Sequence, residues 1–249
     1  MTAFLYKMTC LTNLHVGNGD VNYSIIDNEV ELDYVLKEPT IPSSGVKGAL
    51  LSYVESLKGD HTGLIRTVFG DKDDAKGTYK FLSANLLSRP VRVSEGMYYY
   101  ANATSYELIE RYNYLCDSLD LDTDRLEIET NGCLSSSDIS EVEGMRVDQC
   151  DALASLSGII PEPLVIMPNA KLNTIPLPVT ARNRLGENRN LWYEQFVPYN
   201  SVFYMIIVTP DSENLLDRLI NNRIIQFGGN ASIGYGLIKV EQIAGSKTE

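Results

Sequence analysis

The 249-residue sequence contains few of the side chains that structural metal sites use. Its two histidines are His15 and His61, and its four cysteines lie far apart with no Cys-x-x-Cys pair. A structural zinc site takes about four such ligands at close spacing, so none is expected here. Buried, reduced thiols are the better interpretation of the cysteines. These are Cys10, Cys116, Cys133 and Cys150.

Long apolar runs are also missing. No segment approaches the roughly 18 consecutive apolar residues that indicate a membrane span. The first residues alternate polar and apolar side chains, whereas a signal peptide has a basic stretch followed by an apolar run. We therefore expect a soluble, cytoplasmic protein. With 44% hydrophobic residues, the chain can bury a sizeable core, and we expect one domain.

Basic residues are outnumbered, with 21 Lys and Arg against 33 Asp and Glu and a net charge of −12. This balance argues against a generic nucleic-acid binder, because phosphate binding draws on clustered Lys and Arg. The acids crowd between residues 117 and 143, where Arg125 is the single basic residue. The acids leave room for a basic groove elsewhere on the protein, above all along Arg182, Arg184 and Arg189.

Hydrophobic periodicity predicts an α+β fold. Residues 3–14 alternate as a strand does, and residues 46–57 have helical spacing after two serines that indicate a helix start. Near the end, a strand, a short helix and a second strand are predicted at residues 202–209, 212–221 and 237–243. Strand, helix and strand at both ends are typical of two ferredoxin-like half-units.

The middle of the chain, about residues 63–160, is predicted to be an insertion. It contains two candidate strands, at 81–87 and 90–93, and a candidate helix at 104–119. The Tyr98-Tyr-Tyr100 run is interpreted as strand and core instead of a base-stacking surface, because aromatic residues favour strands. Prolines then mark a loop, and a hairpin arm with a turn at Gly186 is expected within about residues 173–198.

Three stretches resemble signature segments of the RAMP proteins of CRISPR systems. They are His15-Val-Gly-Asn-Gly-Asp20, Ile41-Pro-Ser-Ser-Gly-Val-Lys-Gly-Ala-Leu50 and Phe227-Gly-Gly-Asn-Ala-Ser-Ile-Gly-Tyr-Gly236. Two further stretches resemble the backbone subunit of type III-B (Cmr) complexes. They are Leu191-Trp-Tyr-Glu-Gln-Phe-Val-Pro198, and Phe69-Gly70 leading to residues 81–87 and Pro90-Val91. The resemblance spans nearly the whole chain.

The resemblance implies a ferredoxin-like (RNA-recognition-motif-like) palm with a helical insertion and a β-hairpin thumb. It implies a subunit that stacks in a filament with its own copies and other CRISPR effector subunits along guide RNA. That family cuts complementary single-stranded target RNA at regular intervals with a divalent metal, expected to be Mg²⁺. By position, the carboxylate that supports cutting matches Asp27. The protein itself should show little preference for particular RNA sequences, because base pairing with the guide RNA carries the specificity for the target.

The chemistry of cleavage suits one aspartate. Attack by a ribose 2′-hydroxyl needs in-line geometry, proton removal and stabilisation of phosphorane charge. Asp27 can accept the proton or ligate a water-rich Mg²⁺, and both roles stay open. It can also simply cap a turn, as loop aspartates often do. Asp20 and Asp33 lie on the same segment and are its rivals.

The glycine-rich loop is a candidate RNA contact at Gly228, Gly229 and Asn230. Glycine lets backbone N–H groups approach phosphate without side-chain charge, which suits an acidic protein. The loop matches neither a Walker motif nor a dinucleotide fingerprint, so ATP and NAD are not expected. A plain turn is the alternative. The chain carries Ala231 where the family often has an acid.

Further RNA-binding candidates lie elsewhere in the chain. Ser43, Ser44 and Lys47 stand at a helix start, where free N–H groups attract phosphate, although a serine cap and a solvated lysine explain them equally well. Arg182 and Arg184 alternate along one side of the arm. His15 is a polar candidate in the first loop, and a structural role is its alternative.

Two other functions remain open. The chain can be a structural RNA-binding backbone subunit without cleavage activity of its own. It can also be a guide-processing endoribonuclease of the same superfamily, which normally calls for a histidine acid and base. The two histidines and the motif around Trp192 point away from that second alternative.

Overall fold

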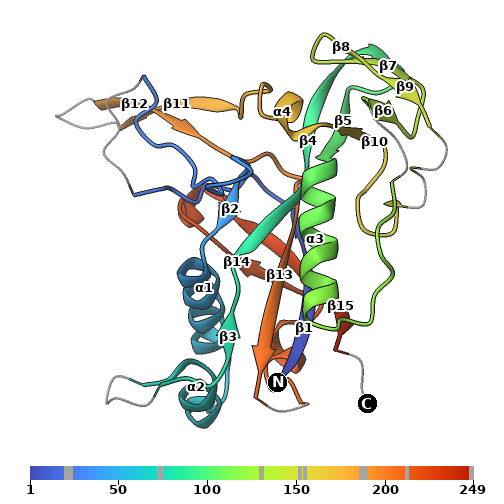
Figure 1. Cartoon of the computed structure of the whole chain (residues 1–249). Coiled ribbons are helices and arrows are strands. Elements are labelled where there is room, and N and C mark those ends of the chain that lie inside the picture. Colours follow the sequence, from blue (N-terminus) through green and yellow to red (C-terminus); the bar gives the residue numbers. More distant parts are fainter. Residues whose placement is uncertain are drawn as a thin grey trace.

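The computed structural model describes residues 1–19, 25–71, 76–128, 132–150, 153, 156–184, 190–210 and 213–246. The candidates Asp20 and Arg189 and the turn predicted at Gly186 lie outside these ranges, and only the backbone is described for Arg184. Within them the protein is α+β, as predicted, with one large sheet and a separate two-stranded sheet (Figure 1).

Four strands form the centre of the large sheet in the order β15-β1-β13-β4. They are β1 (Thr2–Cys10), β4 (Ala84–Gly96), β13 (Val202–Thr209) and β15 (Leu237–Gly245). Each pairs antiparallel with its neighbour. Strands β1 and β4 therefore run the same way with β13 between them, and β13 and β15 do so with β1 between them. Helices lie in both crossover connections, namely α1 (Ser43–Ser56), α2 (Thr62–Phe69) and α5 (Asp217–Ile220).

Strand β13 is buried along its whole length, because both faces of the sheet are covered. Phe203, Met205 and Ile207 join one core cluster, which contains the buried residues of α1 and α5. The alternate residues, from Val202 to Val208, join a second cluster beneath α3 (Tyr106–Ser118). Figure 1 shows α3 lying along the opposite side of the sheet from α1.

Helix α1 buries Val46, Leu50 and Val54, whose spacing of four residues places them on one face. Helix α3 begins where the Ser105 hydroxyl accepts a hydrogen bond from the Leu108 N–H at 3.1 Å. Its Tyr112 ring meets the Tyr204 ring edge to face, with 5.1 Å between the centroids. The helix predicted at 104–119 therefore starts two residues later, because strand β5 (Tyr100–Ser105) runs up to the cap.

The inserted region, for which the resemblance implied helices and the sequence pattern two strands and a helix, contains both helices and strands. Beyond β4 the large sheet continues through β5, β10 (Leu164–Met167), β6 (Leu134–Ser135) and β9 (Asp148–Gln149). Strands β5, β6 and β9, which belong to the insertion, thus extend the sheet.

The remaining short elements of the chain are β2 (Thr40–Ile41), β3 (Lys80–Phe81), β7 (Ile139–Val142), β8 (Met145–Arg146), β14 (Arg223–Gln226), α4 (Asn169–Leu172) and the 3₁₀ turn Ala231–Ile233.

An antiparallel hairpin lies within the predicted arm. Strands β11 (Val179–Arg184) and β12 (Asn190–Gln195) pair from Val179 with Gln195 to Arg184 with Asn190. They form the separate two-stranded sheet, which extends to the upper left in Figure 1.

Several local predictions were wrong. The first strand ends at Cys10 instead of residue 14, and the last helix covers only Asp217–Ile220. The strands predicted at 81–87 and 90–93 are largely one strand, β4. The Tyr98–Tyr100 run is not core, since Tyr99 is 94% exposed. These tyrosines follow Gly96, whose positive φ of 150° turns the chain out of β4.

The thiol prediction was confirmed. All four cysteines are free, three are buried, and Cys150 is half-buried. Burial raises the pKa of Cys116 to about 11, so its thiol stays protonated at neutral pH. In the part of the chain that the structure describes, no helix has both the length and the apolar character of a membrane span.

Replacing the buried Leu50 of α1 by alanine should lower the free energy of unfolding by about 2–5 kcal/mol, because the cavity cannot fully collapse. Glu55→Ala on the exposed face is the matched control and should change it by no more than about 0.5 kcal/mol. Chemical denaturation of both variants measures the difference. Equal effects would contradict this packing of α1.

Candidate functional site

The glycine-rich loop packs directly on the loop that follows β1. The Gly229 N–H donates to the His15 carbonyl at 2.8 Å, and the Gly236 N–H donates to the Asn13 carbonyl at 2.7 Å. Gly228 has a φ of 70°, and a Cβ there would lie 2.3 Å from the His15 oxygen. Only glycine fits that approach. Three predicted RNA contacts, His15, Gly228 and Gly229, are thus brought together.

A buried carboxylate, Glu194, organises the polar side chains next to this contact. It lies on β12 and is 3% exposed. Its Oε2 accepts from Arg182 Nε at 2.5 Å, and its Oε1 accepts from the Asn230 side-chain amide. His15 Nδ1 lies 3.6 Å from Oε1 and 2.7 Å from the Gln195 carbonyl oxygen. We call these four residues, His15, Arg182, Glu194 and Asn230, the Glu194 cluster.

Glu194 is not among the site residues predicted from the sequence. It lies inside the tryptophan-containing segment that carried the resemblance. The available signal was an acid within an apolar and aromatic strand, opposite an arginine-bearing strand. Such an acid needs a buried partner.

Arg182 is engaged inside the protein. Besides its contact with Glu194, its guanidinium lies 4.7 Å from the centre of the Tyr235 ring, and that ring meets Phe196 edge to face at 6.0 Å. Its Nη2 is buried and has no hydrogen-bond partner among the described residues. A direct RNA contact by Arg182 stays a prediction. The side chain of Arg184, its predicted companion, lies outside the described part of the structure.

Asp27 is exposed and docks on the arm. Its Oδ2 accepts from the Tyr193 N–H at 2.7 Å, and its own N–H donates to the Tyr193 carbonyl at 3.0 Å. Asn28, the next residue, pairs with Glu194 through the backbone as an isolated parallel β-bridge. The candidate cleavage carboxylate is therefore held next to the Glu194 cluster.

Asp33, the rival of Asp27, has a structural role. Its Oδ1 accepts from the N–H groups of Val35 and Leu36, at 2.9 and 2.7 Å. Such bonds to the residues two and three positions later stabilise a turn. The carboxylate of Asp33 is therefore occupied in shaping its own loop.

The start of α1 differs from the prediction. Pro42 occupies the position before the helix, no side chain caps it, and Ser43 and Ser44 are its first two residues. The serine cap is therefore wrong, because proline already has a φ of −55° that leads into the helix. The N–H groups of the first turn have no carbonyl partner within the helix. Lys47, which follows this first turn of α1, is half-buried.

An open groove of about 550 Å³ separates α1 from the glycine-rich loop. Its lining is small or uncharged and consists of Gly45, Gly48, Ala49, Ser52, Tyr53, Ser56, Gln226 and Gly228. Two of the three resembling segments therefore border one space. Small side chains let an extended polymer approach the helix backbone closely.

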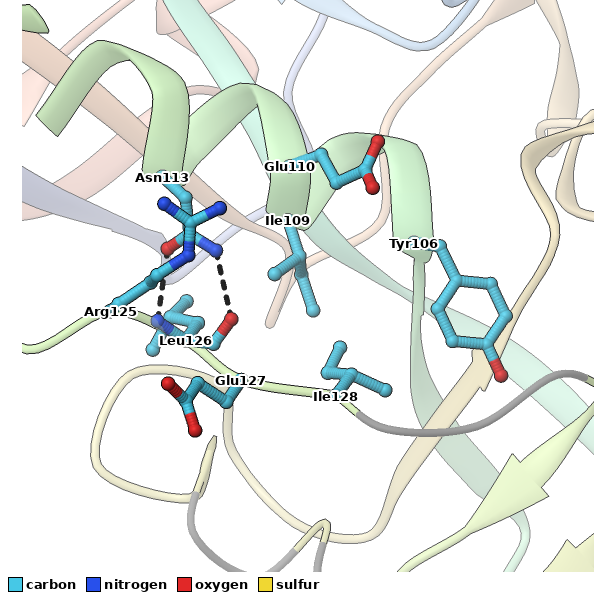
Figure 2. A pocket seen from close by; sticks show the side chains of 8 residues that line it. All are labelled: Tyr106, Ile109, Glu110, Asn113, Arg125, Leu126, Glu127 and Ile128. Atoms are coloured by element: carbon cyan, nitrogen blue, oxygen red, sulfur yellow. Dashed lines mark hydrogen bonds between the residues drawn. The ribbon is translucent and has the colours of Figure 1, made fainter. Parts of the chain in front are cut away.

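A second cavity, of about 340 Å³, lies away from these residues between α3 and residues 125–128 (Figure 2). Tyr106, Ile109, Leu126 and Ile128 line its apolar part, and Asn113 hydrogen-bonds the backbone of Leu126 at 2.8 and 2.9 Å. It contains none of the predicted site residues.

For a metal ion, the described residues offer no group of three or more His, Cys, Asp or Glu side chains close enough to hold it. Asp27 is one exposed carboxylate with one oxygen already bonded to a backbone N–H. A single carboxylate suits Mg²⁺ only when the ion keeps most of its waters. Such binding is usual for this ion, which takes one or two carboxylates plus phosphate.

A model of the RAMP superfamily matches residues 7–239. The chain belongs to this superfamily. Among its relatives, the "CRISPR system Cmr endoribonuclease Cmr4" of Pyrococcus furiosus is 24% identical over 284 residues, covering 96% of this chain and 95% of that protein. The resemblance of this RAMP protein to the backbone subunit of type III-B (Cmr) complexes, which was inferred from sequence motifs, is thereby confirmed.

Two solved structures share the fold of this RAMP protein. One comes from a type III-B Cmr-beta complex bound to cognate target RNA, with a TM-score of 0.81, 22% identity and 96% of both chains covered. The other is an oligomeric Cmr4 from Pyrococcus furiosus, with a TM-score of 0.76, 19% identity and both chains covered completely.

Gly228→Ala should lower the free energy of unfolding by at least about 1–2 kcal/mol, because alanine is strained at a φ of 70° and its Cβ collides with the His15 carbonyl. Gly229→Ala is the control, since a Cβ there meets its nearest neighbour at 3.8 Å. Thermal unfolding compares the two. A well-tolerated Gly228→Ala would contradict the close packing of the two loops.

Glu194→Ala should destabilise the protein by about 3–5 kcal/mol, because it leaves the mostly buried Arg182 guanidinium without its anion. Glu213→Ala removes an exposed partner of Arg218 and should cost no more than about 1 kcal/mol. Denaturant titrations measure both values. Similar small losses would show that the Glu194 cluster does not stabilise the fold.

Proposed function

We propose that this protein is a backbone subunit of a type III-B CRISPR ribonucleoprotein that binds guide RNA and cleaves the paired target RNA. The observation that carries the proposal is the exposed Asp27 carboxylate docked on the arm next to the Glu194 cluster. The proposal is supported by the match of residues 7–239 to the RAMP superfamily and by the relative from Pyrococcus furiosus, which is named an endoribonuclease.

In this proposal the guide backbone follows the groove between α1 and the glycine-rich loop. Free N–H groups at the start of α1 and the glycines of the loop supply donors for phosphate without basic side chains. The strand order β15-β1-β13-β4 supports a ferredoxin-like palm, and the β11–β12 hairpin supports a thumb. Copies of the chain then stack along the guide with other effector subunits in the cytoplasm.

Cleavage in this proposal uses the target's own 2′-hydroxyl, whose oxygen bonds to the adjacent phosphorus while the bond from phosphorus to the 5′-oxygen breaks. The products are a 2′,3′-cyclic phosphate and a 5′-hydroxyl, which takes its proton from water. Asp27 accepts the hydroxyl proton or orients the attacking group, while the bond from Tyr193 N–H fixes one of its oxygens. Asp27 is the residue that would hold a water-rich Mg²⁺, whose positive charge would offset the negative charge of the phosphorane. Regular spacing of the cuts follows from the repeat of the subunit along the guide.

A subunit that only holds RNA is the second candidate. The observation that favours it is the hydrogen bond from Tyr193 to Asp27, because a merely structural aspartate makes the same contact. Guide processing by the isolated subunit has less support. The His15 ring nitrogen Nδ1 is held at the Gln195 carbonyl inside the protein.

Asp27→Asn should slow cleavage of guide-complementary RNA by the assembled complex by about 10²–10⁴-fold. Asparagine keeps an oxygen that can accept from the Tyr193 N–H but removes the charge, so RNA binding should persist. The rate is measured with Mg²⁺ and with EDTA at equal RNA occupancy.

Asp33→Asn is the matched control, because its oxygen can still stabilise the turn, and its cleavage rate should stay near wild type. Unchanged cleavage by Asp27→Asn would favour the purely structural subunit or a role for Asp20. Specific cutting of repeat RNA by the isolated subunit would favour the guide-processing function.

A further inference from the structure

The loop that carries Asp27 continues into a small hairpin at residues 31–40. The Thr40 N–H donates to the Glu31 carbonyl at 3.0 Å, and the Asp33 N–H donates to the Glu38 carbonyl at 2.8 Å. Leu32 and Pro39 pair between these bonds. The hairpin therefore connects its turn by paired backbone to the segment that begins at Asp27.

A buried ion pair holds one strand of this hairpin. The Glu38 Oε2 accepts from Arg89 Nε at 3.0 Å, and the two side chains are 2% and 3% exposed. Burial raises the pKa of Glu38, and the Arg89 guanidinium opposes that rise. Buried pairs often contribute little net stability, so the fixed geometry of the pair is a better guide to its role.

The same arginine holds the base of the arm. Its Nη2 donates to the carbonyls of Leu172 and Ile175, each at 2.9 Å. These carbonyls lie at the end of α4 and in the segment that leads to β11. A planar guanidinium reaches three acceptors in fixed directions, which the single ammonium of lysine cannot reproduce.

Helix α4 holds the turn of the hairpin independently. The Leu36 carbonyl accepts from Asn169 Nδ2 at 2.7 Å and from Asn173 Nδ2 at 3.0 Å. Asn169 is itself fixed to α3, since its N–H donates to Glu107 Oε2 at 2.9 Å. Figure 1 shows α4 between the start of β11 and the upper end of α3.

Residues 27–38 are thus attached to the arm at two places. Asp27 binds Tyr193 on β12, while Glu38 and Leu36 bind Arg89 and α4 at the base of β11. We propose that Arg89 is a positioning residue for Asp27, because it fixes the Asp27 loop and the base of the arm in one buried cluster. This inference rests on the proposed cleavage function.

The test replaces the ion pair by unbranched apolar side chains, as Glu38→Met/Arg89→Met, so that no buried charge is left unpaired. The assembled complex with guide RNA is compared with wild type in single-turnover cleavage at saturating target and, separately, in target affinity. We expect the rate to fall about tenfold to hundredfold while the affinity stays within about twofold, because a misplaced group slows chemistry more than binding.

Asn173→Ala gives a second, milder probe, because Asn173 is exposed and its removal deletes one bond to Leu36. Its rate should also fall while its affinity is retained. The matched control is Asn113→Ala, which removes two buried hydrogen bonds at the cavity of Figure 2, away from the Asp27 loop. Its rate should stay at the wild-type value.

A wild-type rate in the double variant, or in Asn173→Ala if the double variant does not assemble, would overturn the proposal. A rate loss equal to that of Asn113→Ala would overturn it as well, because general destabilisation would then explain the effect. Asp27→Asn is measured in parallel. Normal cutting by that variant would refute the proposed function itself. Slow cutting by Asp27→Asn, together with wild-type rates in Glu38→Met/Arg89→Met and Asn173→Ala, would refute only the role of Arg89.

Discussion

The central strand β13 must bury both of its faces, and this constraint arranges the rest of the structure. Its alternate side chains enter two separate cores, one beneath α1 and α5 and one beneath α3. With both faces covered, the sheet has no broad exposed surface in its centre. The polar residues of the candidate site therefore lie on loops at the strand ends, where His15, the glycine-rich loop and the arm meet.

The meeting point combines rigid packing with buried charge. Gly228 approaches the His15 carbonyl too closely for any side chain, while Glu194 joins side chains from the first loop, the arm and the glycine-rich loop. Close backbone contact and one internal carboxylate thus align these loops with each other, without surface lysines. The scarcity of basic residues in the sequence is consistent with this arrangement.

Local patterns predicted the long elements with a strong apolar periodicity. Residues 46–57 and 202–209 have apolar side chains that match one helix face and one fully buried strand, and both elements are present. The prediction that the Tyr98–Tyr100 run belongs to the core was wrong, although Tyr100 begins strand β5. Gly96, where the chain turns, was the better signal. Contacts between distant residues were not predictable: Glu38 and Arg89 are 51 positions apart, and no periodicity links them.

The groove beside α1 has a consequence for the ions around it. Its lining residues carry no charged side chain. A nucleic acid held mainly by lysine and arginine displaces condensed cations, and its affinity falls steeply as salt rises. A strand held by backbone N–H groups and close contact displaces few of them. RNA bound in this groove would therefore keep most of its own counterion atmosphere, and its retention would depend on fit more than on ionic strength.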